Sequence, residues 1–212
     1  MLLLVLTAVG SGTGDDRPAT FQAQPQSLTG LGYQTFTVLD ALGWIFIGLI
    51  IWSLGVFIGP FSPSRSRLAS VFGIATFVGA LGGFTRNQAV SGLAASYVSA
   101  SPAQQTVILY TYNTLYNIIN AMFTTGSIFQ AAGFLLVAST LLAVPTFPRW
   151  LAAWVGIPGV TSSILFIIDI VAPRSYIFVP IFLIYIIVGI IGLSFALAWR
   201  LRRPFTDSMP AS

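Results

Sequence analysis

Residues 106–145 form a stretch without a single charged side chain, and the only proline in it is the last residue. A helix of this length would be about 60 Å long, roughly twice the thickness of the hydrocarbon core of a bilayer. The stretch is therefore either one helix that projects from the membrane or two spans that break at residues 124–126. The distribution of arginine along the chain fits both arrangements equally well. We favour one helix, because several asparagines in a short span would be costly if they faced lipid.

A polar stripe runs along the first half of this stretch. Asn113, Asn117, Asn120, Thr124 and Ser127 follow one another at alternating intervals of four and three residues. This spacing places all of them on one face of a helix. The stripe is the clearest polar feature in the apolar part of the sequence.

The composition places the chain among membrane proteins and excludes several kinds of chemistry. Of its 212 residues, 56% are hydrophobic and only 7% are charged, which is far from the composition of a soluble domain. All basic residues are arginine and all acidic residues are aspartate; lysine, glutamate, histidine and cysteine are absent. The sequence therefore offers no imidazole base, no thiolate nucleophile, no zinc site and no Schiff-base lysine. The net charge of +4 is read as a membrane-topology signal and not as a nucleic-acid footprint.

These features predict an all-α, polytopic transmembrane helical bundle with five full spans and an N-terminal partial span. Residues 1–10 are either part of a first span or a signal-like segment, residues 11–37 an extracytoplasmic loop, residues 38–203 the bundle and residues 204–212 a cytoplasmic tail. The full spans are expected at about residues 39–59, 68–84, 106–145, 150–171 and 176–199. Residues 85–105 are expected to connect the second and third of these spans.

Small residues recur at every fourth position of the second span. Ala75, Gly79 and Gly83 would let another helix approach closely where the hydrophobic effect no longer drives association. We interpret them as residues for helix packing, either within the chain or against a partner.

Two short segments resemble those of a known family: the junction VPTFPRWLAAWVG (residues 144–156) and the opening FVP (residues 178–180) of the last span. The pattern resembles an uncharacterised bacterial family of six-span integral membrane proteins, a domain of unknown function. The resemblance covers about residues 38–202. It implies that residues 1–10 are the remnant of a first span, and it supports one long helix at residues 106–145. Because the family has no assigned activity, the resemblance transfers no functional residue.

One candidate site follows from the predicted topology, which puts several polar residues at the outer ends of the spans. Ionisable groups near the hydrocarbon usually face the bundle and pair, so we expect an outward-facing polar cluster. It comprises Asp40, Arg86, Asn113, Asn117, Asn120 and Asp169. The cluster either staples helices together or forms a pocket for a ligand or an ion.

The sequence favours a non-catalytic structural or accessory component of a bacterial cytoplasmic membrane, with the carboxyl terminus in the cytoplasm. The alternative is a carrier or receptor for a small molecule or ion, with an outward-facing polar pocket between helices. No cofactor and no metal is expected. The expected partners are the lipid bilayer and other membrane subunits, and no nucleic acid.

Overall fold

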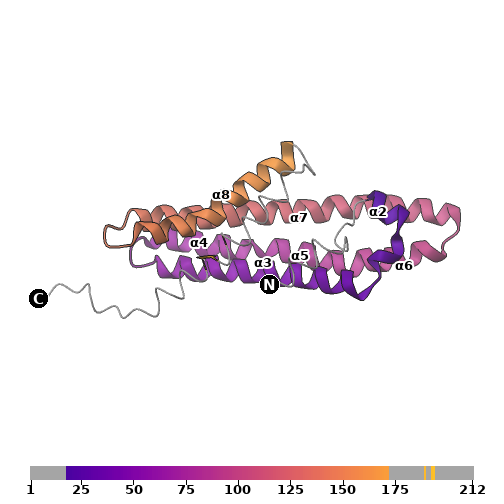
Figure 1. Cartoon of the computed structure of the whole chain (residues 1–212), viewed down its shortest axis with the longest axis horizontal. Helices are drawn as coiled ribbons and strands as arrows, with labels where there is room; N and C mark the ends of the chain where they lie inside the picture. Colours follow the sequence, from indigo (N-terminus) through magenta and orange to yellow (C-terminus); the bar gives the residue numbers. More distant parts are fainter. Residues whose placement is uncertain (1–17, 172–188, 190–191, 194–212) are drawn as a thin grey trace, which may run out of the picture. The chain divides into compact units, whose positions relative to one another are not determined.

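The computed structural model describes residues 18–171, 189, 192 and 193, and within these ranges the ordered elements are all helices. Figure 1 labels the main ones. In chain order they are α2 (Pro18–Ala23), the 3-10 helix η1 (Pro25–Leu28), α3 (Leu31–Phe57), α4 (Pro63–Ala75), α5 (Phe77–Thr85), the π-helical turn η2 (Arg86–Val90), α6 (Ser91–Ser99), α7 (Pro102–Leu142) and α8 (Arg149–Val171). The predicted all-α class is confirmed.

Four segments in the described part of the chain are long and apolar enough to cross a membrane. They are Leu31–Phe57, Pro63–Ser99, Pro102–Leu142 and Arg149–Ile168. The second of them combines α4, α5, η2 and α6. The predicted segment 1–10, most of the predicted last span at residues 176–199 and the tail 204–212 lie outside the described residues.

The charge-free stretch is one helix, as we favoured: α7 continues for 41 residues from Pro102 to Leu142. Its start is explained by local chemistry. Pro102 occupies the first helical position, where its missing N–H costs nothing. The side chain of Gln104 accepts a hydrogen bond from the backbone N–H of Ser101 at 3.0 Å, in the manner of a capping box. The helix ends shortly before Pro145, since proline disfavours helical geometry in the residue that precedes it.

Two segments that the sequence predicts as a loop or a connection contain helices. The segment 11–37 is not simply a loop, because it contains α2 and η1, and α3 begins already at Leu31 instead of near residue 39. Likewise, the expected connection at residues 85–105 is helical as far as Ser99. In both places the helix continues into a more polar sequence, because side chains such as Tyr33 and Ala94 are buried against other parts of the protein. Packing of this kind stabilises helices whose sequences carry a weak apolar signal.

The chain divides into two compact units. Unit 1 comprises residues 1–48 and 75–126, and unit 2 comprises residues 49–74 and 127–212. The core of unit 1 is a cluster of buried side chains contributed by α2, η1, α3, η2, α6 and α7: Phe21, Leu28, Tyr33, Val90, Ala94, Tyr112 and Ile119.

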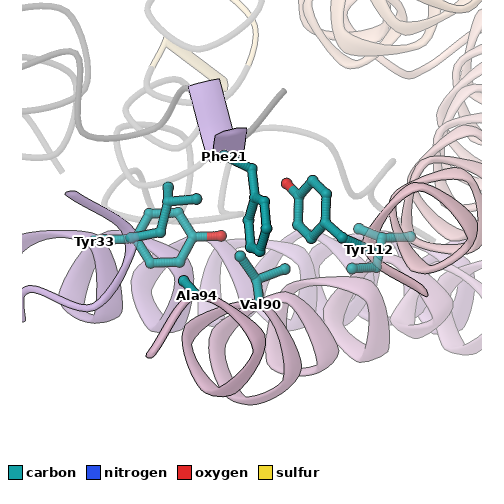
Figure 2. Close-up of a cluster of buried hydrophobic side chains, with 7 residues drawn as sticks. Phe21, Tyr33, Val90, Ala94 and Tyr112 are labelled. Atoms are coloured by element: carbon teal, nitrogen blue, oxygen red, sulfur yellow. The ribbon is translucent and has the colours of Figure 1, made fainter. Parts of the chain in front are cut away.

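Phe21 lies at the centre of this cluster although it belongs to the short helix α2. Figure 2 shows its ring between Tyr33 and Tyr112, above Val90. The rings of Phe21 and Tyr112 are stacked with their centroids 3.9 Å apart, and Tyr97 meets Phe21 edge-on at 5.4 Å. This packing holds α2 and η1 as a cap on α6 and α7.

Unit 2 is built from close contacts at glycines. A Cβ atom at Gly55 of α3 would lie 2.9 Å from the backbone nitrogen of Ser70 in α4. A Cβ at Gly159 of α8 would lie 2.8 Å from Cγ of Leu135 in α7. Helices can approach this closely only when a side chain is missing from the contact.

Helix α8 continues through Pro158, a residue type that favours a kink, and its ribbon is bent in Figure 1. Proline removes one backbone donor from a helix. The hydroxyl of Thr161 donates to the carbonyl oxygens of Ile157 at 2.8 Å and of Pro158 at 3.2 Å. These bonds add to the backbone bonds of the turn; the carbonyl that Pro158 leaves without its usual N–H donor is that of Trp154, four residues earlier.

Candidate functional site

Arg86 and Asp40, the ionisable residues of the predicted cluster in unit 1, lie on neighbouring turns of adjacent helices. A Cβ atom at Gly83 in α5 would meet Cβ of Ala41 at 2.9 Å and its backbone nitrogen at 3.1 Å. This contact brings the turn of α3 that carries Asp40 against the turn that precedes Arg86. Both side chains are half-buried. The expected proximity of these two residues is thus reflected in the helix packing.

Arg86 also faces α7. Its guanidinium carbon lies 5.9 Å from the centroid of the Phe123 ring, a distance at which the positive charge is attracted by the electrons of the ring. Phe123 is half-buried and packs against the core cluster of unit 1. Arg86 therefore takes part in the contact between η2 and α7.

The π-helical turn η2 carries a second polar residue that the sequence analysis did not single out. Asn87 donates from its side-chain amide to the carbonyl oxygen of Gln34 at 2.8 Å and to the hydroxyl of Thr37 at 2.7 Å. One turn later, Ser91 donates to the carbonyl oxygen of Leu28 at 2.8 Å. Single π turns often mark functional positions; here the turn places side chains that bind the N-terminal part of unit 1.

The asparagine stripe of α7 lies on the outside of unit 1. Asn113, Asn117 and Asn120 are exposed, whereas Tyr112 and Ile119 on the neighbouring face are buried in the core. Phe123, the residue beneath Arg86, belongs to that inner face. The structure consequently brings Asp40 and Arg86 onto neighbouring turns but presents the three asparagines on a different face of α7.

Asp169, the last residue of the predicted cluster, lies near the end of α8 in unit 2. Its side chain lies outside the described part of the structure. The remaining members of the predicted cluster belong to unit 1.

The small residues expected in helix packing lie between the end of α4 and the last turn of α5. A Cβ atom at Gly79 would clash with the indole ring of Trp44, while Gly83 faces Ala41 as described above. Ala75 is half-buried at the end of α4. The contacts of Gly79 and Gly83 are made within the chain, to α3.

A buried hydrogen bond joins α7 and α8 in unit 2, and it too escaped the sequence analysis. The side-chain amide of Gln130 donates to the hydroxyl of Ser162 at 2.8 Å, and only 3% and 2% of these residues are exposed. An uncharged polar residue within or at the edge of an apolar stretch is the sequence pattern that could have indicated both this pair and Asn87. Such residues usually bond to another helix.

A pocket of about 510 Å³ lies in unit 1, between the segment 23–27 and the ends of α6 and α7. Tyr97, Val98 and Gln105 line its other side, and none of the described residues in its wall is charged. Asp40, Arg86 and the three asparagines of the predicted cluster do not contribute to this wall. In the described residues, no three histidine, cysteine or acidic side chains gather where they could hold a metal ion.

A family model described as "Domain of unknown function (DUF4386)" matches residues 2–199 of the chain. The chain belongs to this family. The resemblance to a family without an assigned activity is confirmed, and the match extends beyond the residues that carried it. No curated protein and no solved structure matches the chain. Membership in this family therefore indicates no activity for the chain.

Proposed function

We propose that this DUF4386 protein is a non-catalytic helical component of a bacterial cytoplasmic membrane that binds another membrane protein through α7. The observation that supports this proposal is the exposure of Asn113, Asn117 and Asn120 on one side of that helix. A carboxamide is both a donor and an acceptor of hydrogen bonds. In a membrane, a row of such groups is a suitable contact for a helix with matching polar residues.

The surroundings of the stripe fit a protein partner. Apolar and aromatic side chains are exposed beside it on α7: Val107 is 65% exposed, Tyr110 75% and Ile118 48%. The stretch 106–145 carries no charge, so a partner helix would meet no uncompensated charge on α7. Fully desolvated apolar groups around a few polar contacts are the usual composition of a helix contact in membranes.

The use of polar side chains elsewhere in the protein supports the same interpretation. Asn87, Ser91 and Gln130 are all engaged in bonds between separate elements. These three side chains therefore serve the association of separate elements. We extend that role to the stripe, whose partner would be a second protein.

The proposal can be tested by site-specific photocrosslinking in intact cells. A photoreactive amino acid at Asn117 is expected to give a discrete adduct with one membrane protein, whereas the same group at Leu81, which is 59% exposed on α5, should give none. The double substitution Asn113→Leu and Asn120→Leu should abolish the adduct without lowering the amount of folded protein. If Asn117 and Leu81 behave alike, α7 has no protein partner and the proposal is wrong.

The proposed orientation has the carboxyl terminus and the arginine-rich connections in the cytoplasm. The positive-inside rule supports it, because six of the nine arginines then lie inside: Arg65, Arg67, Arg149, Arg200, Arg202 and Arg203. Single cysteines can be introduced without background, since the chain has none. A membrane-impermeant thiol reagent should label Ser27→Cys but not Ser64→Cys or Ser208→Cys in intact cells. The reverse pattern would refute the orientation.

A further inference from the structure

Two connections that are far apart in the sequence meet in unit 2. The first joins α3 to α4 and contains Phe61; the second joins α7 to α8 and contains Phe147. The ring of Phe57, at the end of α3, meets both, with centroid distances of 6.3 Å to Phe61 and 6.0 Å to Phe147. These aromatic contacts hold the two connections together.

Arginines follow both connections directly. Arg65 and Arg67 lie in the first turns of α4, and Arg149 is the first residue of α8. All three side chains are exposed. The aromatic contacts therefore gather three positive charges at one end of unit 2.

No acidic side chain in the sequence between residues 41 and 168 could neutralise these charges. The next acidic residue of unit 2 is Asp169, near the opposite end of α8, about 30 Å from Arg149 along the helix axis. Within the described residues of unit 2, the patch is thus basic without local compensation. It attracts anions over a distance of about 10 Å at moderate salt.

The position of the patch favours one class of anion. Arg65, Arg67 and Arg149 lie where apolar helices begin, and exposed aromatic residues lie near them in the sequence: Phe61 is 47% exposed and Trp150 44%. Exposed aromatic rings beside arginine at the ends of spans are typical of the level of the lipid headgroups. Guanidinium groups bind phosphate through paired hydrogen bonds.

We propose that Arg65, Arg67 and Arg149 form a binding site for the phosphate headgroups of anionic phospholipids, framed by Phe57, Phe61, Phe147 and Trp150. The rings fix the two connections next to each other, and the arginines hold the headgroup against them. Lipid bound here bridges the α3–α4 and α7–α8 connections. This inference does not depend on the partner proposed for α7.

The test uses the full-length protein in nanodiscs of phosphatidylcholine, with or without phosphatidylglycerol. Anionic lipid should raise the midpoint of thermal unfolding of the wild type, by about 2–4 °C for each arginine engaged, and 0.5 M salt should reduce this shift. The variant R65Q/R67Q/R149Q should lose most of the shift although it keeps Arg200, Arg202 and Arg203. The variant R65K/R67K/R149K keeps the charge and should retain a large part of it.

Several outcomes would overturn the proposal. Equal shifts for the wild type and the glutamine variant would place lipid binding elsewhere. A shift with inorganic phosphate in detergent as large as that with phosphatidylglycerol would identify a site for free phosphate instead. If the glutamine variant fails to fold, native mass spectrometry of R65Q and R149Q singly replaces the comparison: fewer retained phosphatidylglycerol molecules support the site, and unchanged retention contradicts it.

Discussion

The capped end of unit 1 and the α7–α8 pair of unit 2 are held together by different contacts. At the capped end, a large buried ring, Phe21, is surrounded by tyrosines, and Asn87 and Ser91 bond to backbone carbonyls. In the α7–α8 pair, Gly159 lets the helix backbones approach, and a single side-chain bond joins Gln130 to Ser162. A large buried side chain therefore stabilises the capped end, whereas a missing side chain allows close packing in the α7–α8 pair.

The surroundings of each region determine which kind of contact stabilises it. Burial of a large ring is favourable when the alternative is water, and the sequence around Phe21 is polar and turn-rich. In lipid this gain is lost, so helices associate through close packing and occasional hydrogen bonds. The contacts therefore differ in kind: burial of large side chains stabilises the capped end, and close packing with one hydrogen bond stabilises the α7–α8 pair.

The largest effect is expected at Phe21. Phe21→Ala removes the fully buried ring at the centre of the cap, which should cost about 3–5 kcal/mol of the stability of that contact. Limited proteolysis should then cleave within residues 18–28, while α8 remains protected. Phe46→Ala, at a ring that is 52% exposed, is the matched control and should leave the digestion pattern unchanged. Equal digestion of both variants would mean that Phe21 does not hold the cap.

A smaller effect is expected from Gly159→Ala, at the contact between α7 and α8. The new Cβ would lie 2.8 Å from Cγ of Leu135 and 3.1 Å from its backbone nitrogen, so the helices must separate. We expect a loss of about 1–3 kcal/mol in thermal or denaturant unfolding. Gly43→Ala and Gly92→Ala meet no atom within 4 Å and should be neutral or slightly stabilising. If Gly159→Ala is neutral, close packing at this glycine does not stabilise the contact between α7 and α8.

Asn87→Ala should cost about 1–3 kcal/mol, because it deletes two hydrogen bonds and leaves the carbonyl of Gln34 and the hydroxyl of Thr37 with one partner fewer. Hydrogen exchange should rise at the start of α3. The adjacent Gln88 is exposed in the same turn, and Gln88→Ala should leave exchange there unchanged. Comparable exchange in both variants would show that η2 does not anchor α3.

The smallest effect is expected for the bond between Gln130 and Ser162. A double-mutant cycle with Gln130→Leu and Ser162→Ala isolates the coupling between them. Interhelical bonds in membranes contribute about 0.6–2 kcal/mol, and we expect a coupling free energy within this range. A coupling free energy larger than the loss of stability in Asn87→Ala would mean that hydrogen bonding contributes more to the α7–α8 pair than to the capped end.

The helical class and the long helix could be predicted because apolarity and the absence of proline act over many residues at once. The role of Gly79 and Gly83 in packing could be predicted for a similar reason, since their spacing matches the helical repeat. The cap could not be predicted from the sequence. Phe21 is one aromatic residue in a polar segment, and only tertiary contacts give such a residue its role.

The candidate site shows the same limit. The spacing of Asn113, Asn117 and Asn120 correctly places them on one face of a helix. It carries no information about which neighbour that face meets, and the structure leaves it outside unit 1. For Arg86 and Asp40 the predicted order of the spans was sufficient, because adjacent antiparallel helices bring the end of one beside the start of the other.

The packing of Trp44 provides an optical probe of folding in unit 1. Its indole fills the space left by Gly79 in α5 and Gly126 in α7, and its ring lies 5.8 Å from Phe123. In contrast, Trp52 and Trp150 are each 44% exposed. A variant that keeps Trp44 as its only tryptophan would therefore report the assembly of α3, α5 and α7 through the wavelength and intensity of its fluorescence, without any attached dye.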